Sequence, residues 1–398
     1  MMAAWEAKPL GQIVSLQRGF DLPTQSRSEG KIAVIGSNGI VGFHNSMPSE
    51  VPIPGLMLGR SGSVGEITYW DKKYWPLNTV LYVKDFHGND PYFLSFWLQL
   101  FPFKQYAQGV SVPTLNRNSI NDVLFPIPKL EDQQKIALAL SVVATSIKFN
   151  AAAIAKSQEL KRTAMRDLFA RGLRGEAQKE TEFGLVPESW VVSMLSEVSS
   201  IERGRFLHRP RNEPRFYGGP TPFVQTGDVV RSAGRIRDFT QSLNSDGVRI
   251  SRVFPAGTIL ITIAANIGYT GILQFASACP DSLVAITPNP NVDTSFLEYF
   301  LQTQQPEMDR RAPKGTQKNI NIQFLNPWPV PVPPLDEQGE IVAILDAIDR
   351  KIELHQKKRA TLEELFKALL HRLMTGEIRV TDLDLSALSQ TSMTGAAA

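Results

Sequence analysis

Cysteine and histidine are scarce in this chain of 398 residues. Its single cysteine, Cys279, excludes an internal disulfide bond, and a reducing compartment is the simplest expectation. The five histidines are scattered along the chain and do not show the spacing of a zinc site. We therefore expect no bound metal ion.

Charge of one sign and long uninterrupted apolar runs are also missing. A net charge of +3 permits a nucleic-acid partner without requiring one, and 42% hydrophobic with 20% charged residues is typical of a globular protein. Residues 136–155 are in principle long enough to cross a bilayer, but Lys148 and Asn150 interrupt them, so we predict a soluble helix with one apolar stripe. The chain starts without a basic segment and apolar run, so we expect no secretory signal, a cytoplasmic location and no membrane partner.

The motifs of phosphate and cofactor chemistry are absent as well. No GxxxxGK[ST] loop occurs, and GRSGSVG at residues 59–65 lacks the lysine that would bind phosphates, which argues against an ATP motor. NDPY at residues 89–92 partly resembles the tetrapeptide of adenine methyltransferases, but its second proline is missing. We predict that Asp90 starts a turn before a helix. The chain is expected to hold no catalytic residue and no cofactor.

The sequence does contain an internal repeat. PIPKLEDQQKIA begins at residue 126, and PVPPLDEQGEIV begins 205 residues later, at residue 331. The match extends upstream to Trp5 and Trp190 and downstream to Leu168 and Leu373. The chain is therefore two copies of one unit, each a globular part followed by a long helix, and pseudo-twofold symmetry is the expected use of the repeat.

The repeat also predicts the boundaries of the parts. In chain order they are a globular domain at 1–128, a central helix at 129–175, a linker at 176–188, a second globular domain at 189–333, a C-terminal helix at 334–380 and a mobile tail at 381–398.

Both long helices have a recognisable start and an apolar seam. Prolines end the preceding segment, and the acidic pairs 131–132 and 336–337 suit the positive end of a helix dipole. A seam that is apolar except at His355 and Arg359 then recurs at alternating spacings of four and three from Ile341 to Leu373, a coiled-coil pattern. If the two helices pair in antiparallel fashion, Asn150 and His355 meet at their middles, and we predict a structural polar contact between them.

The globular parts are predicted to mix strands and helices. KIAVIG, GEITYW, NTVLYVK, GTILITIA and SLVAITP are rich in β-branched and aromatic residues, as strands are. FLSFWLQLF and FLEYFLQTQ are predicted to be short buried helices. The expected fold class is α+β, with two similar mixed α/β domains separated by two long antiparallel coiled-coil helices.

In this arrangement the chain resembles the specificity subunits of type I restriction-modification enzymes. The resemblance covers essentially the whole chain and depends on two globular parts, each followed by a PxPxLxxQ helix, with FGLVPESW opening the second unit. It implies two target-recognition domains that each read half of a split double-stranded DNA site. It further implies methyltransferase subunits, two in number, docked on the helices, and motor-nuclease subunits in the full complex.

Arginines and amides mark the candidate DNA contacts of the second domain. Arginine suits phosphate contacts and guanine, whereas amide side chains suit adenine edges. The candidates are Arg203, Arg205, Arg209, Arg211, Arg215, Gln225, Thr226, Asn266, Lys314, Gln317, Lys318 and Asn319.

The first domain offers a smaller and different set. Its candidates are Arg60, Ser61, Lys72, Lys73, Thr114, Asn116 and Arg117. Where Arg60 and Ser61 stand in the first copy, the second copy has alanines and Asn266. We therefore expect the two domains to read different half-sites. For the glycine-rich stretch around Arg60, a tight turn without DNA contact is an equally good interpretation.

Two other functions remain open from the sequence. One is a self-sufficient adenine methyltransferase, which would bind S-adenosylmethionine on its own. The other is a specificity subunit of a fused restriction-modification enzyme, or a purely structural adaptor. The target bases and the spacer between half-sites do not follow from the sequence.

Overall fold

The computed structural model describes residues 5–109, 111–181, 184–313 and 318–383. The chain forms two compact units. Unit 1 contains residues 1–151 and 357–398, and unit 2 contains residues 152–356. Each unit therefore combines one globular domain with parts of two long helices, and each long helix runs from one unit into the other.

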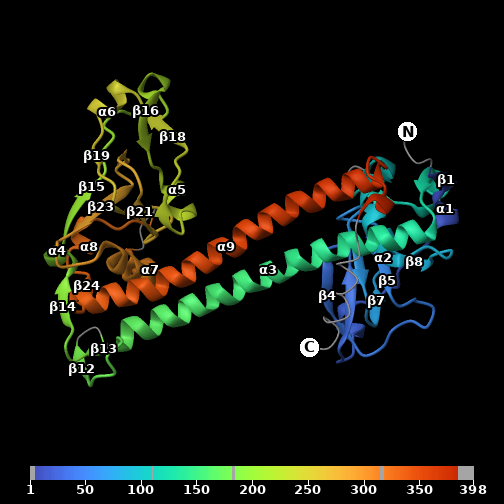
Figure 1. The fold of residues 1–398 in the computed structure, drawn as a ribbon, viewed down its shortest axis with the longest axis horizontal. Helices are drawn as coiled ribbons and strands as arrows, with labels where there is room; N and C mark the ends of the chain where they lie inside the picture. Colours follow the sequence, from blue (N-terminus) through green and yellow to red (C-terminus); the bar gives the residue numbers. More distant parts are fainter. Residues whose placement is uncertain (1–4, 110, 182–183, 314–317, 384–398) are drawn as a thin grey trace. The chain divides into compact units, whose positions relative to one another are not determined.

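The two long helices are α3 (Leu130–Arg171) and α9 (Leu335–Met374), and they pack as an antiparallel coiled coil (Figure 1). In unit 1, Ile136 and Leu140 near the start of α3 share a core with Leu373 near the end of α9. In unit 2, Phe169 near the end of α3 shares a core with Ile341 near the start of α9. This order confirms the predicted antiparallel pair, and both helices carry the acidic pair in their first turn.

Among the described helices, α3 alone is long and apolar enough to cross a membrane by length and composition. Its apolar residues Ile136, Ala137 and Leu140 are buried in the protein core of unit 1. Asn150 is buried and belongs to unit 1, whereas His355 belongs to unit 2. The predicted contact between Asn150 and His355 stays a prediction.

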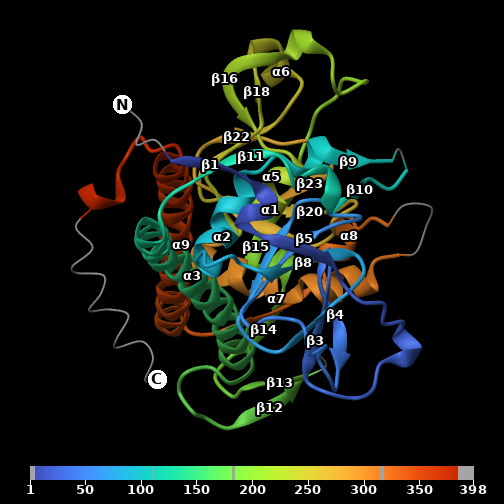
Figure 2. The same ribbon diagram turned by 90° about the vertical axis from the view of Figure 1, so that its right-hand side faces the viewer.

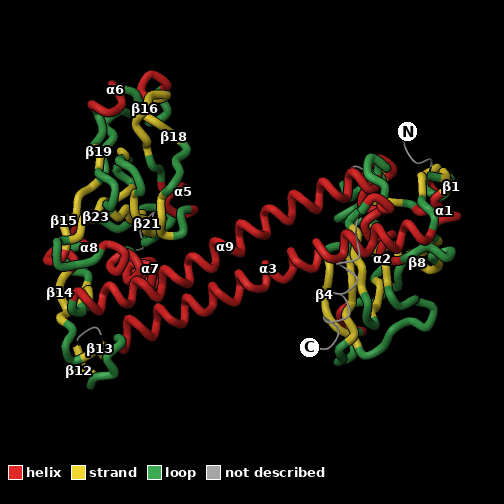
Figure 3. Tube along the Cα trace, viewed as in Figure 1, coloured by secondary structure: helices red, strands yellow, loops and turns green. Residues whose placement is uncertain are grey.

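The first domain contains two small sheets with short helices between the strands (Figure 3). The larger sheet has the order β2–β8–β5–β6, and the smaller has the order β4–β3–β7. The bounds are β2 (Ser15–Arg18), β3 (Ile32–Gly36), β4 (Gly39–His44), β5 (Gly55–Gly59), β6 (Ile67–Trp70), β7 (Tyr74–Pro76), β8 (Val80–Asp85), α1 (Leu10–Ile13) and α2 (Pro91–Trp97). Short strands β9 (Ala107–Gln108) and β10 (Thr114–Leu115) pair beside them.

The second domain repeats the larger sheet and extends it. Its order β15–β23–β20–β21 matches the first domain strand for strand, and a fifth strand, β17, adds to the edge at β21. The bounds are β15 (Ser199–Arg203), β17 (Gly234–Ile236), β20 (Ile259–Thr262), β21 (Thr270–Leu273), β23 (Leu283–Pro288), α4 (Leu195–Val198), α5 (Thr226–Arg231), α7 (Thr294–Arg311) and α8 (Ile322–Leu325). These strands confirm the predicted mixed α/β fold.

A second sheet in this domain has the order β18–β16–β22–β19. Its strands are β16 (Tyr217–Phe223), β18 (Gln241–Leu243), β19 (Val253–Phe254) and β22 (Ser277–Ala278), with α6 (Ser245–Arg249) beside them. The segment between α3 and this domain forms a hairpin of β12 (Gln178–Thr181) and β13 (Gly184–Pro187), which lies beyond the end of α3 (Figure 2).

The repeated PxPxLxxQ motif ties each domain to its long helix. The Gln133 side chain accepts a hydrogen bond from the Asp90 amide (2.9 Å) and donates to Pro128 O (2.9 Å) and Asn89 Oδ1 (2.8 Å). Gln338 repeats this with the Asp293 amide (2.7 Å), Pro333 O (2.9 Å) and Asn291 O (3.2 Å). Both glutamines are buried. We call Gln133, Gln338 and these partners the glutamine clasps.

The two aspartates held by the clasps start the short helices of the domains. Asp90 Oδ1 accepts from the Phe93 amide at 2.6 Å at the start of α2, and Asp293 Oδ1 accepts from the Phe296 amide at 2.9 Å at the start of α7. A side-chain oxygen at this position satisfies an amide that has no partner within the helix. Asp90 of the NDPY stretch therefore has the predicted structural role.

Candidate nucleic-acid interface

Six separated segments of the second domain meet around one pocket. They are the end of β15, the loop that contains Arg211, the start of α5, the loop between β20 and β21, the turn before β23 and the segment around Asn319. The pocket has a volume of about 570 Å³. Of the residues predicted from sequence, Arg203, Arg211, Gln225, Thr226, Asn266 and Asn319 line it, together with Asp281 and Ser282.

Asp281 gathers three of the predicted arginines. Its carboxylate accepts from Arg209 at 2.9 Å and forms a second ion pair with Arg211, while its backbone oxygen accepts from Arg203 Nε at 2.7 Å. Two guanidinium groups therefore share one carboxylate, which leaves a net positive charge beside the pocket. Sequence reasoning missed Asp281, because nothing local links it to arginines 70 or more residues away.

Three of the predicted arginines, Arg205, Arg209 and Arg215, do not line this pocket. Arg209 is linked to it through its ion pair with Asp281, which does line it. Arg205 donates to Ser251 O at 2.8 Å and so links the end of β15 to the segment before β19. The Arg215 guanidinium lies 4.6 Å from the centre of the Phe216 ring and faces a different hollow, which it shares with His208 and Arg249. The structure therefore divides the arginine run into a group at the pocket and a group outside it.

Polar side chains hold the α5 edge of the pocket in place. The Gln225 side chain donates to Gln241 Oε1 at 2.9 Å, and the Gln225 backbone N–H donates to Asp228 Oδ2 at 2.8 Å. The Thr226 hydroxyl lies 3.3 Å from the Ser282 hydroxyl. Because Ala265 has a φ of 63°, the loop between β20 and β21 turns sharply just before Asn266.

The first domain has the same construction at the equivalent place. Ser61 and Thr114 form an isolated antiparallel β-bridge between their backbones, and Ala264 and Asn319 form the corresponding β-bridge in the second domain. The Arg60 guanidinium donates to Asn78 O at 3.3 Å, so Arg60, Ser61 and Thr114 lie together.

A carboxylate also holds an arginine here. Arg18, the repeat counterpart of Arg203, donates to Asp21 at 3.2 Å, and Asn78 also donates to Asp21. Asp21 thus pairs with an arginine in the first domain as Asp281 does in the second. Arg18, Asp21 and Asn78 were not among the candidates from sequence.

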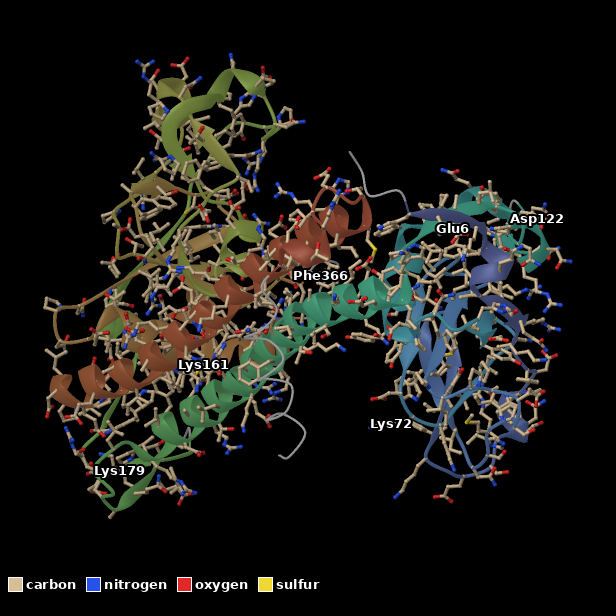
Figure 4. The ribbon with its side chains drawn as sticks, turned by 45° about the vertical axis from the view of Figure 1, so that its right-hand side comes forward. Glu6, Lys72, Asp122, Lys161, Lys179 and Phe366 are labelled. Carbon is tan, nitrogen blue, oxygen red and sulfur yellow. The ribbon has the colours of Figure 1, made fainter. Side chains whose placement is uncertain are left out.

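The remaining candidates lie elsewhere or are used within the fold. Lys72 and Lys73 follow β6, at the opposite end of the β5–β6 hairpin from Arg60. Figure 4 marks Lys72. Arg117 donates to Leu16 O at 3.0 Å, and the Asn116 side chain accepts from the Asn118 amide at 3.0 Å. Lys318 pairs with Asp309 at 2.8 Å. Lys314 and Gln317 lie outside the described residues.

The tract before Lys318 is partly helical, because α7 continues through Pro306 to Arg311. Arg310 donates to Glu307 at 2.7 Å, and Arg311 forms a second ion pair with it. Hydrogen bonds from these two arginines lower the pKa of Glu307 to about 2. Both arginines thus have an acidic partner on their own helix.

The described residues offer little for metal or thiol chemistry. Within them, no group of three or more His, Cys, Asp or Glu side chains is placed to hold a metal ion. Cys279 is fully buried, and burial raises the pKa of its thiol to about 12. A thiol with such a pKa is almost entirely protonated at neutral pH and is a poor nucleophile.

Known proteins are similar to this chain in sequence and in fold. The putative type I restriction enzyme MjaX specificity subunit of Methanocaldococcus jannaschii is 28% identical over 298 residues, which cover 73% of this chain and 69% of that protein. The MjaVIII specificity subunit of the same organism is 25% identical over 300 residues, covering 71% and 68%. The crystal structure of a type I restriction-modification S subunit from M. genitalium aligns with a TM-score of 0.67 over 92% of this chain and 95% of that one, at 17% identity.

The family model of the type I restriction modification DNA specificity domain matches residues 2–161 and 187–364. Each match covers one globular domain and most of the long helix that follows it. These two matches together span most of the chain, and the chain therefore belongs to the family of type I restriction modification DNA specificity domains.

Proposed function

We propose that this chain is the DNA-sequence-recognition subunit of a type I restriction-modification complex and that it has no catalytic activity of its own. The observation that carries the proposal is the pocket of the second domain. Six residues selected from the sequence as DNA contacts, drawn from separate segments, line one hollow of about 570 Å³. A convergence of guanidinium, amide and hydroxyl groups suits base edges together with phosphates.

The two kinds of side chain would have different tasks. Arg203, Arg209 and Arg211 would contact phosphates and position the domain on the duplex. Gln225, Asn266 and Asn319 would read base edges, since a carboxamide can both donate to and accept from adenine. Before DNA arrives, Arg209 and Arg211 pair with Asp281, whose carboxylate would compete with the phosphates for these two guanidinium groups.

We further propose that the two domains read unlike halves of an asymmetric site. The first domain would use Arg60, Ser61 and Thr114, where the second uses Ala264, Asn266 and Asn319. A guanidinium favours guanine and a carboxamide favours adenine, so the same backbone framework carries different base preferences. Lys72, Lys73, Asn116, Arg117 and Lys318 remain candidates for contacts outside the pocket, as do Arg205 and Arg215.

The long helices would space the domains and dock the catalytic partners. With 42 residues, α3 is about 60 Å long at about 1.5 Å per residue. Half-sites read from one face of the duplex lie about 34 Å apart, so the helix exceeds one helical turn of DNA. We propose two methyltransferase subunits as the partners on the helices and motor-nuclease subunits in the complete complex. The domain boundaries at 128, 175, 188, 333 and 380 belong to this proposal.

A self-sufficient methyltransferase is a weaker candidate. Asp90, the acidic residue of the NDPY stretch, accepts the hydrogen bond that starts α2, and its amide is held by Gln133. Both groups are thus used within the fold. Equilibrium dialysis of the purified chain with S-adenosylmethionine tests this alternative directly, and saturable binding by the chain alone would favour it.

The main experiment is to coexpress the chain with its methyltransferase partner and map the methylated bases of the host genome. We expect one bipartite asymmetric motif with a fixed spacer. Replacing Asn319 by Ala should relax only the half-site read by the second domain, and Ser61→Ala should affect only the other half. The double variant would be expected to affect both halves. Methylation without a bipartite motif, or by the methyltransferase without this chain, would contradict the proposal.

A further inference from the structure

The second domain meets the long helices through a cluster of charged groups around Tyr299. The Tyr299 hydroxyl, on α7, lies 2.7 Å from Asp346 Oδ1 and 2.7 Å from Asp349 Oδ2, both on α9. Tyr299 is buried, and all three residues belong to unit 2. A phenol has one proton to donate, so two carboxylates this close to one hydroxyl require positive charge nearby.

Lys161 and Arg235 supply that charge from two different elements. Lys161, on α3, donates to Asp349 Oδ2 at 2.8 Å, and its Nζ lies 4.8 Å from the centre of the Tyr299 ring. Arg235, on β17, pairs with Asp346 at 3.3 Å and lies 5.1 Å from the same ring. The two side chains are only 14% and 20% exposed, so water screens these pairs less than it screens a surface pair.

The cluster continues into the second domain through Glu298. Its carboxylate is fully buried and accepts from Gln302 at 2.7 Å, from Thr270 at 3.0 Å and from Arg235 at 3.2 Å. Burial raises the pKa of this carboxyl, and the hydrogen bond from Gln302 and the charge of Arg235 oppose that rise. Arg235 therefore joins a carboxylate of the domain to a carboxylate of the long helix.

The corresponding junction of the first domain is aromatic. Tyr69 on β6 contacts Tyr92 with ring centres 4.9 Å apart, and Tyr92 contacts Phe96 on α2 at 5.0 Å. Phe96 in turn contacts Phe366 on α9 at 5.7 Å. All four residues belong to unit 1, and Figure 4 marks Phe366 on α9 and Lys161 on α3.

The internal repeat shows that these junctions occupy equivalent positions. The residue 205 positions after Lys161 is Phe366, its counterpart in the repeat. Phe93 aligns with Phe296, so Phe96 and Tyr299, each three residues further on, are also counterparts. The counterparts of Asp346 and Asp349 in α3 are Ser141 and Ala144. Arg235 lies on β17, the strand that the first sheet lacks. At equivalent positions, the junction of the second domain therefore has ionic contacts and the junction of the first domain has aromatic contacts.

We propose that Lys161, Arg235, Asp346 and Asp349 are positioning residues that fix the angle of the second domain on the helices. Charge-assisted hydrogen bonds are directional, and those of this cluster join α3, β17 and α7 to the same stretch of α9. Aromatic packing has softer angular preferences, so the first junction tolerates small rotations that the second does not. The spacer between half-sites is then set chiefly at the second junction. This last step rests on the proposed function, whereas the rigidity of the junction does not.

The rigidity is measured in the full chain by the distance distribution between two spin labels. One pair is introduced at Ser200 and Gln356 in unit 2, and a second pair at Lys84 and Lys148 in unit 1. All four positions are exposed, and the native Cys279 is buried, so the labelling reagent does not reach it. Lys161→Met should broaden the distribution of the unit 2 pair and leave the unit 1 pair unchanged.

Two control variants separate positioning from general destabilisation. Lys161→Arg retains the charge and should restore the narrow distribution. Lys135→Met removes a lysine from the same helix, where it pairs with Glu131 on an exposed face, and should change neither distribution. Tyr299→Phe gives the second domain the residue of the first and should broaden the unit 2 distribution with little effect on folding.

The functional arm uses the methylation map of cells that coexpress each variant with the methyltransferase partner. Lys161→Met should add sites whose spacer differs by one base pair, while the bases of both half-sites stay the same. An unchanged unit 2 distribution in Lys161→Met and Tyr299→Phe overturns the proposal, as does equal broadening in both units. Broadening together with an unchanged spacer removes the link to spacing. If wild type itself yields no bipartite motif, the proposed function fails and the label result still decides the rigidity of the junction.

Discussion

Replacing the buried glutamine of a clasp by methionine should destabilise one unit selectively. Gln338→Met keeps the length and approximate volume of the side chain but removes all its hydrogen bonds. The Asp293 amide then loses its acceptor, and the oxygens of Pro333 and Asn291 lose their donor. We expect unit 2 to be affected and unit 1 to keep its own clasp at Gln133.

The expected loss of stability follows from the three lost hydrogen bonds. A net contribution of about 1 kcal/mol per hydrogen bond gives a loss of about 3 kcal/mol for Gln338→Met. The side chain is fully buried, so water cannot replace the lost partners without opening the junction. Gln133→Met should cost unit 1 a similar amount, because its three contacts have similar lengths.

Native-state hydrogen exchange is the appropriate assay, because two units need not unfold in one transition. Amides in the core strands β20 and β23 should exchange faster in Gln338→Met, while those of β5 and β8 keep the wild-type rate. Gln99→Met is the matched control: Gln99 is exposed and donates a single hydrogen bond, to Ser95 O at 2.8 Å. A loss below about 0.5 kcal/mol, or an equal loss in both units, would refute the clasp as the tie between domain and helix.

Three further predictions follow from the structure. Asp281→Asn should strengthen binding to any DNA duplex by about threefold to tenfold near 0.1 M salt, because Arg209 and Arg211 lose a competing carboxylate. The slope of the logarithm of the binding constant against the logarithm of the salt concentration should steepen by about one. Weaker binding in a filter assay would mean that Asp281 chiefly organises the arginines. Cys279 should stay unmodified by a thiol reagent at pH 8 until the chain unfolds, because burial raises its pKa to about 12; rapid modification of the native chain would contradict this. Arg174 pairs with Asp336 at 3.1 Å and with Glu340 at 2.8 Å, but its side chain is 41% exposed. Arg174→Ala should therefore lower the free energy of unfolding in urea by less than about 1 kcal/mol. A larger loss would show that these pairs act as a network.

The fold was largely predictable because its signals are local or repeated. Proline followed by an acidic pair marks where α3 and α9 begin, and the spacing of apolar residues reflects their shared seam. The β-branched segments became β3, β6, β8, β20 and β23. The length of α7 was wrong in the prediction, since the helix continues past Pro306 and includes Arg310 and Arg311. The arginines Arg310 and Arg311 are therefore part of a helix.

The candidate site was predictable in its residue types and less so in its membership. Arg203, Asn266 and Asn319 have the chemistry of a DNA contact and do line the pocket. Arg205 has the same chemistry but is bonded to Ser251 O, which depends on how two distant loops approach each other. Asp281 and Asp21 were missed because an acidic residue has no obvious use in binding DNA until its arginine partners are seen. Such pairings are properties of the tertiary structure.

Each recognition domain enters and leaves its long helices through one pair of neighbouring strands. In the first domain β1 (Glu6–Pro9) pairs with β11 (Leu124–Ile127), and in the second β14 (Val191–Met194) pairs with β24 (Pro329–Val332). The two ends of a domain are therefore held side by side, next to a clasp that bonds mainly to backbone atoms. A domain of another sequence that keeps these paired strands and the groups that bind the clasp and the long helices would fit in its place. Recombination at these strands could thus exchange one half-site for another as a cassette, while the helices and their partners stay the same.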